Sequence, residues 1–187
     1  IKMLNGLVRQ NLSLASSSYR EINDRNYNLL NVMKSSHLQL PDMLVKNLEL
    51  VLNFDLRKLF NNCTDRIDVH ELERIIDEIK KWNFKMDHAE LNFICAGTID
   101  KLLLQLGTLT NGNAHRAGET LKNVREALSL LSKVGIKPDL NEIQDIVFSH
   151  LVSLNPEIPA DVQESLKLFG EYVNLDVGLI INREKPA

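Results

Sequence analysis

The sequence predicts an all-α protein. Along nearly the whole chain of 187 residues, apolar side chains recur at steps of three and four, the spacing of one face of a helix. Aromatic residues make up only 5% of the chain, and there are only 8 Gly and 5 Pro. A β-sandwich needs many tight turns, and this chain has too few turn-forming residues for them. We expect a single helical domain over 1–187, with about six to seven helices in an irregular antiparallel bundle.

The first two helices are expected over 4–33 and from Pro41 to the Asn-rich turn at 61–64. Proline is tolerated at a helix start because that position needs no amide donor. Serines at 16–18 weaken the first helix, and we expect a bend there. The stripes expected to be buried are Leu4, Val8, Leu12, Ala15, Tyr19, Ile22, Leu29, Leu30 and Met33, then Leu44, Leu48, Val51, Leu52, Leu56 and Leu59.

Four later helix starts share one pattern, an aspartate followed three residues on by a glutamate. Such an aspartate can accept a hydrogen bond from a free amide of the first turn, and the glutamate lies at the positive end of the helix dipole. We therefore expect each aspartate to be an N-cap. The pairs are Asp68 and Glu71, Asp87 and Glu90, Asp139 and Glu142, and Asp161 and Glu164.

The remaining segments are read from turn signals. A fifth helix is expected over 113–134, with Gly135 as the residue that ends it and Pro138 as a stop. The polar connection at 108–116 contains Asn-Gly-Asn and is the predicted loop or internal boundary. The strand-like segment at 177–181 is short and terminal, and we interpret it as an extended tail packed on the helices.

Charge and cysteine usage exclude several classes of protein. The net charge of −3 argues against a general nucleic-acid binder. No apolar run approaches the roughly 20 residues that span a bilayer, and no secretory signal is present, so we expect no membrane contact. Cys63 and Cys95 are far apart and form no C-x-x-C pair, which predicts reduced, buried thiols and a cytoplasmic protein.

The chain carries no recognisable catalytic, metal or cofactor motif. Its 5 histidines occur singly and form no H-E-x-x-H pattern. A calcium loop ending at Glu73 fails because Ile67 stands where glycine is required and Arg66 where an oxygen ligand is required. No glycine-rich phosphate loop or nucleophile elbow is found. We therefore predict no catalytic residue, no metal and no cofactor in this chain.

Two features remain as candidates for substrate binding. Trp82 is the only tryptophan and lies at an expected helix end, where it is either an apolar lid or a platform for a sugar or a partner. The second feature is the polar set Asn53, Asp55 and Arg57 within an apolar helix. These side chains either face solvent or form a buried polar network or ligand contact.

Parts of the sequence resemble a known helical domain. Leu38-Gln-Leu-Pro-Asp-Met-Leu44, followed by Val51-Leu-Asn-Phe-Asp-Leu-Arg57, is similar to a block of the uncharacterised helical domain that follows the catalytic barrel in proteins related to glycoside hydrolase family fifty-seven. The segments 72–87 and 138–145 are similar to later parts of that domain. Gln144 matches its Leu-Trp-x-x-Gln-Asn segment, whereas Asn141 and Asp145 replace the Trp and the Asn.

The resemblance implies a C-terminal portion of a larger bacterial or archaeal protein that acts on α-linked glucans, as a glycoside hydrolase or a glucanotransferase. Its nucleophile and general acid would lie on the upstream barrel, and no position here matches them. The start at Ile1-Lys2, without an initiator Met, agrees with a fragment.

The leading hypothesis is a non-catalytic accessory domain that packs on this barrel and contributes either to the substrate cleft, where it would contact carbohydrate, or to assembly. The alternatives are a free-standing helical module that binds a protein partner and, third, a helical enzyme without a recognised motif.

Overall fold

The computed structural model describes residues 2–84, 86–106, 114–153 and 158–182, with side chains from 15 to 180 within those ranges. This part contains eight helices and no strand, so the predicted all-α fold is confirmed. The helices are α1 (Lys2–Ser35), α2 (Asp42–Asn61), α3 (Val69–Trp82), α4 (His88–Leu104), α5 (Ala114–Ser132), α6 (Asn141–Val152), α7 (Ala160–Tyr172) and α8 (Val177–Asn182).

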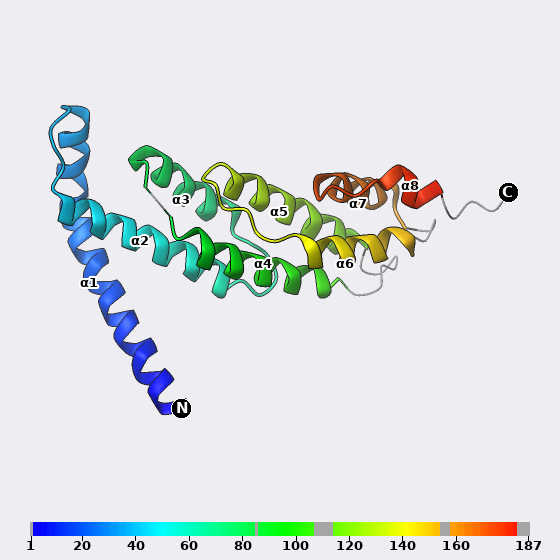
Figure 1. The fold of residues 1–187 in the computed structure, drawn as a ribbon, viewed down its shortest axis with the longest axis horizontal. Coiled ribbons are helices and arrows are strands. Elements are labelled where there is room, and N and C mark those ends of the chain that lie inside the picture. The colour runs from blue at the N-terminus through cyan, green and yellow to red at the C-terminus, as the bar shows by residue number, and fades with distance from the viewer. Residues whose placement is uncertain (1, 85, 107–113, 154–157, 183–187) are drawn as a thin grey trace.

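Helices α2 to α6 alternate in direction along the long axis of an elongated body (Figure 1). α2 packs against α3 and α4, α5 packs against α3, α4 and α7, and α6 packs against α4, α7 and α8. α1 crosses α2 at one end of this body, and its N-terminal part points away from the other helices. Figure 1 also shows that α1 changes direction near the crossing.

One continuous apolar cluster runs through the body, from Leu30 on α1 to Val177 on α8. The predicted stripe of α2 contributes Leu48, Leu52 and Leu56 to this cluster. The predicted stripe of α1 is wrong in part, because Leu30 is its only buried member among the described side chains, while Ile22 and Leu29 are exposed. α1 crosses its neighbour instead of lying along the core, so much of its length stays uncovered. The predicted core residues Leu4, Val8 and Leu12 lie outside the described side chains.

The N-cap prediction holds for two of the four aspartates. Asp68 and Asp87 cap α3 and α4, and each accepts a hydrogen bond from the backbone N–H three residues on. Asp139 instead lies one residue before the N-cap of α6 and accepts a hydrogen bond from the Asn141 N–H at 3.1 Å. Asp161 lies inside the first turn of α7, because the Pro159 carbonyl already accepts hydrogen bonds from the first turn.

The predicted end of the fifth helix is confirmed. Gly135 has a φ of 78°, its N–H donates to the Ser132 carbonyl, and the Ile136 N–H donates to the Leu131 carbonyl. These are the two hydrogen bonds of a Schellman motif, which needs a left-handed residue after the helix. The helix itself begins at Ala114, so residues 114–116 of the predicted loop are helical, and its residues 108–113 lie outside the described part.

The extended tail predicted at 177–181 is wrong, because this segment lies within α8. Asp176 initiates the helix: its Oδ1 atom accepts a hydrogen bond from the Leu179 N–H at 3.0 Å, and its carbonyl accepts one from the Ile180 N–H. A strand here would leave its backbone groups unpaired, since the described part of the chain offers no strand beside it. The helix pairs these groups internally and buries Val177 against Gly170.

Candidate functional site

The polar set of α2 divides between two faces of the helix. Successive residues are about 100° apart, so Asp55 points away from the face that Asn53 and Arg57 share. Asp55 lies towards α1, where Arg20 binds it with both terminal nitrogens; one of these contacts, from Nη1 to Oδ2, measures 3.3 Å. The carboxylate is buried, whereas the Arg20 side chain is 43% exposed. This ion pair joins α1 to α2 where the two helices cross.

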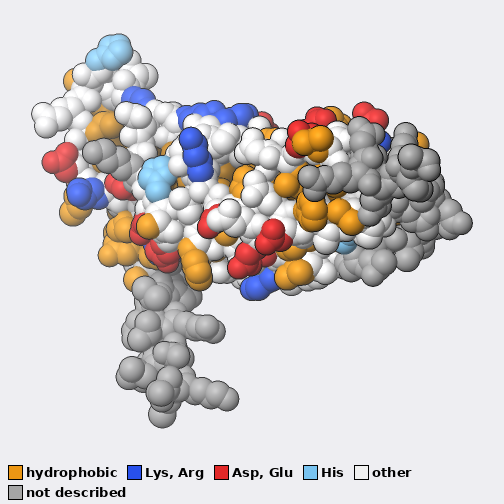
Figure 2. All heavy atoms as spheres, turned by 45° about the vertical axis from the view of Figure 1, so that its right-hand side comes forward, with side chains coloured by type: hydrophobic (Ala, Val, Ile, Leu, Met, Phe, Trp, Pro, Cys, Tyr) orange, Lys and Arg blue, Asp and Glu red, His pale blue; other side chains and the backbone are white. Residues whose placement is uncertain are grey.

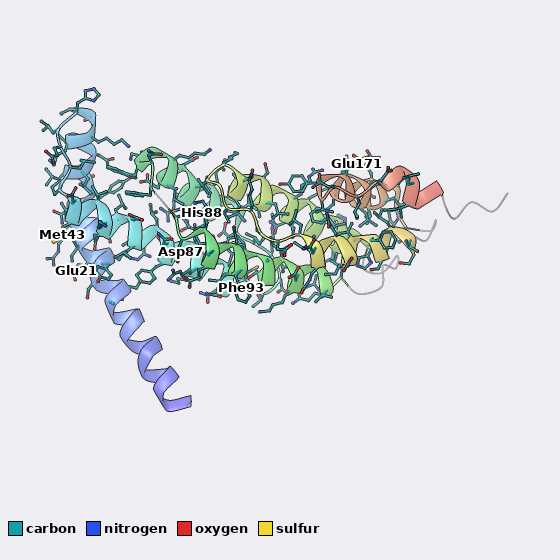
Figure 3. The ribbon with its side chains drawn as sticks, viewed as in Figure 1. Glu21, Met43, Asp87, His88, Phe93 and Glu171 are labelled. Carbon is teal, nitrogen blue, oxygen red and sulfur yellow. The ribbon has the colours of Figure 1, made fainter. Side chains whose placement is uncertain are left out.

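Asn53 and Arg57 lie towards the N-terminus of α4. The Asn53 amide donates to the Glu49 carbonyl at 2.9 Å, and its oxygen accepts a hydrogen bond from the Asp87 N–H at 3.5 Å. Arg57 binds the Glu90 carboxylate. Its guanidinium is also 3.8 Å from the Asp87 carboxylate. Figure 3 shows Asp87 at the start of α4, beside α2. Asn53 and Arg57 therefore join α2 to the start of α4.

A cleft of about 550 Å³ opens between α1 and α2. Asp55 and Arg57 both line it, as do Phe54 and Arg20, while Asn53 and Trp82 do not. The Arg57 guanidinium lies 5.9 Å from the centre of the Phe54 ring, and its Nε atom is buried without a hydrogen-bond partner. The cleft thus combines the carboxylates of Asp55 and Glu90, guanidinium groups and an aromatic ring, which are groups able to bind a polar ligand.

Trp82 lies apart from the cleft and is only 8% exposed. Phe84 stacks on its ring at a centroid distance of 6.4 Å, and Tyr27 meets it edge-on at 6.3 Å. Its indole N–H donates to Glu78 at 2.9 Å. Phe84 is brought there by Asn83, whose left-handed φ of 55° ends α3 in a Schellman motif. A sugar could stack on Trp82 only after displacing one of these neighbours.

The other titratable groups form no metal-binding arrangement in the described part of the chain. No group of three or more His, Cys, Asp or Glu side chains there could hold a metal ion. Burial raises the pKa of the Cys95 thiol to about 12, so this side chain is not a nucleophile in the folded protein. Burial also lowers the pKa of His150, and no described carboxylate is paired with it.

Sequence reasoning missed the groups that hold the candidate residues. Arg20 is 35 residues from Asp55, and Glu90 is 33 residues from Arg57, so no local motif links either pair. It also missed the exposed apolar side chains of α1, α2 and their connection. We call this group the α1–α2 apolar set, and its members are Ile22, Leu29, Val32, Leu38, Met43 and Leu50.

The α1–α2 apolar set lies at one end of the molecule. Figure 2 shows hydrophobic side chains at this end as well as further along the same face, and Figure 3 shows Met43 beside the crossing of the two helices. Met43 is 77% exposed. Six of the twelve large apolar side chains exposed on the described surface belong to this set. Such a concentration is typical of a surface that contacts another molecule.

The comparisons with known proteins give no family for this chain. It matches no family model, no curated protein and no solved structure. None of the described helices is both long and apolar enough to cross a membrane.

Proposed function

We propose that this chain is a non-catalytic helical module that packs on another protein surface through its α1–α2 end. The observation that carries the proposal is the α1–α2 apolar set, which the two crossing helices and their connection leave exposed. Exposed apolar side chains gain free energy when a partner removes them from water, so several at one end of a domain favour a contact there. The resemblance supports the catalytic barrel of an α-glucan-acting enzyme of the same protein as this surface.

The experiment begins with the coding sequence upstream of Ile1. If it encodes a barrel, the barrel and this chain are produced separately and their affinity is measured by calorimetry. Leu29→Ser and Met43→Ser should each weaken binding about tenfold, since each removes one buried apolar contact. Leu179→Ser is the matched control, because Leu179 is exposed on α8 at the other end. Unchanged affinity in both variants would refute the proposal.

A free-standing module that binds a protein partner in trans is the alternative. It is supported by the same apolar set, which two helices and their connection present together. An upstream sequence without a barrel would favour this alternative over the accessory domain. The two free cysteines, one buried and one half-buried, support a reducing, cytoplasmic location in either case.

Carbohydrate binding is a second candidate function, favoured by the cleft that Phe54, Asp55 and Arg57 line. Addition of a maltooligosaccharide should then shift the backbone amide resonances of 54–58. Arg57→Ala should abolish these shifts. A change in Trp82 fluorescence would point instead to the aromatic site on α3, and no change in either signal would remove the carbohydrate proposal.

A further inference from the structure

Helix α1 shares little of the apolar core. Among its described side chains only Leu30 is fully buried, at 1% exposure. By contrast, α2 is shorter and buries Leu48, Val51, Leu52 and Leu56, together with other side chains. Because apolar burial supplies most of the local stability, a helix that buries so little is expected to open more readily than its neighbours.

Polar contacts hold α1 in place instead. The Asn47 amide donates to the Tyr19 carbonyl at 2.8 Å, and Arg20 pairs with Asp55. The densest group of contacts lies further along α1, around Tyr27. These ties depend on charge and on hydrogen bonds that water can replace, so each contributes little net stability.

The contacts around Tyr27 form a clamp between α1 and α3. The Tyr27 hydroxyl donates to Glu78 at 2.6 Å and accepts a hydrogen bond from Lys81 at 3.0 Å. Trp82 donates to the second oxygen of Glu78 at 2.9 Å and meets the Tyr27 ring edge-on. Lys34 of α1 lies 4.6 Å from the centre of the Trp82 ring. We call these five side chains the Tyr27 clamp.

Glu78 is the centre of the clamp. Burial alone would raise the pKa of this carboxyl group, but the hydrogen bonds from Tyr27 and Trp82 and the nearby Lys81 bring it below its usual value. The group is therefore an anion at neutral pH, and it binds α1 and the end of α3 together. Loss of the Tyr27 hydroxyl would remove the direct hydrogen bond between the two helices.

We propose that α1 is a reversibly detachable helix, which the Tyr27 clamp closes and which opens while α2 to α7 stay folded. Opening would carry Leu30, Tyr27 and Lys34 away from the body and leave Trp82 in water. Opening would therefore uncover one end of the domain while the core formed by α2 to α7 stays intact. This inference does not depend on the docking proposed above, which concerns the α1–α2 apolar set and not the Tyr27 clamp.

Hydrogen exchange of the complete chain, measured by mass spectrometry on peptides of α1 and α5, tests the proposal. We expect residues 15–35 of α1 to exchange at least about a hundredfold faster than the buried part of α5. Tyr27→Phe and Glu78→Gln should each speed exchange in α1 by about tenfold, the size expected for loss of a hydrogen bond to a charged group. Exchange in α5 should not change.

Glu73→Gln is the matched control, because Glu73 lies on the same helix as Glu78 and makes no ion pair or hydrogen bond in the described part. It should leave exchange in α1 unchanged. Equal protection of α1 and α5 in the unaltered chain would overturn the proposal. So would clamp variants that speed both helices equally, which would make α1 part of the cooperative core, or variants that speed neither.

Discussion

At the scale of single residues, the surroundings decide what a side chain does. Asp55 and Asp100 both lie within helices, but Asp55 has an arginine partner, whereas the Oδ1 atom of Asp100 is buried without a hydrogen bond. Burial raises the pKa of Asp100 to about 6, and the charge of Glu142, a side-chain hydrogen bond with Glu142 and the charge of Asp139 all act in the same direction. Asp100 is therefore a place where charge opposes the packing of α4 against α6.

Asp100→Asn should make the protein more stable at neutral pH. The pKa of Asp100 is 3.8 in the unfolded chain and about 6 in the folded protein. The protonated carboxyl group therefore contributes its full stability below about pH 4, and this contribution is lost as the pH rises through about 6. Allowing for partial solvent screening, the gain at pH 7.5 should be about 1 kcal/mol in the free energy of unfolding, and near zero at pH 4. Urea denaturation at the two pH values measures it. Substitution of the exposed Asp77 by Asn is the control. Equal gains from Asp100→Asn at both pH values would contradict the raised pKa of Asp100.

The buried Asn123 on α5 shows the opposite case, a polar side chain whose groups are satisfied. Its amide accepts a hydrogen bond from the Ile67 N–H at 2.9 Å and donates one to the Ile67 carbonyl at 2.9 Å. Asn123→Ala should cost about 2–4 kcal/mol, because it leaves two buried backbone groups without partners. Chemical denaturation checks this, with exposed Lys122→Ala as a neighbour expected to change stability by less than about 0.5 kcal/mol.

At the scale of helices, local signals set the ends and tertiary contacts set the neighbours. Asn83 and Gly135 end their helices through left-handed backbone conformations and leave an apolar residue, Phe84 or Ile136, to pack back on the preceding turn. In addition, the Gly135 carbonyl lies 3.0 Å from the ring nitrogen Nδ1 of His88, so the end of α5 contacts the start of α4. The ends are therefore also points where helices are joined.

Two glycines within helices should respond to substitution in opposite ways. A Cβ atom at Gly97 would meet nothing within 4 Å, so Gly97→Ala should stabilise α4 by about 0.5–1 kcal/mol through helix propensity. A Cβ atom at Gly170 would lie 2.9 Å from Val177 and 3.0 Å from Leu151, so Gly170→Ala should cost about 1–3 kcal/mol. Thermal unfolding of both variants decides this, and a stabilised Gly170→Ala would show that α8 does not pack as described.

At the scale of the whole molecule, one core joins α2 to α8, and α1 adds Leu30 to it at one end. Leu52 lies in this core. Leu52→Ala should cost about 2–5 kcal/mol in the free energy of unfolding, as for other buried large-to-small changes. Leu50→Ala, on the exposed face of the same helix, should cost much less. Similar costs for the two variants would mean that α2 is not oriented as described.

The sequence predicted more of the fold than of the candidate site. The helical spacing, the caps at Asp68 and Asp87 and the stop at Gly135 rest on contacts between residues at most five positions apart. The exposed Ile22 could not be foreseen, because its apolar spacing is the same whether or not another helix covers it. For the candidate site, the sequence indicated Asp55 and Arg57 but neither Arg20 nor Glu90, which hold them.

The sequence by itself determined that this chain is helical and where most of its helices begin and end, since hydrogen bonds and capping within one or two turns are short-range. Only the tertiary structure decided which polar side chains are satisfied. Tyr27 and Glu78 are 51 residues apart, and Asn123 and Ile67 are 56 apart. Partners so distant meet only once the helices pack, because burial removes the water that would otherwise satisfy each group.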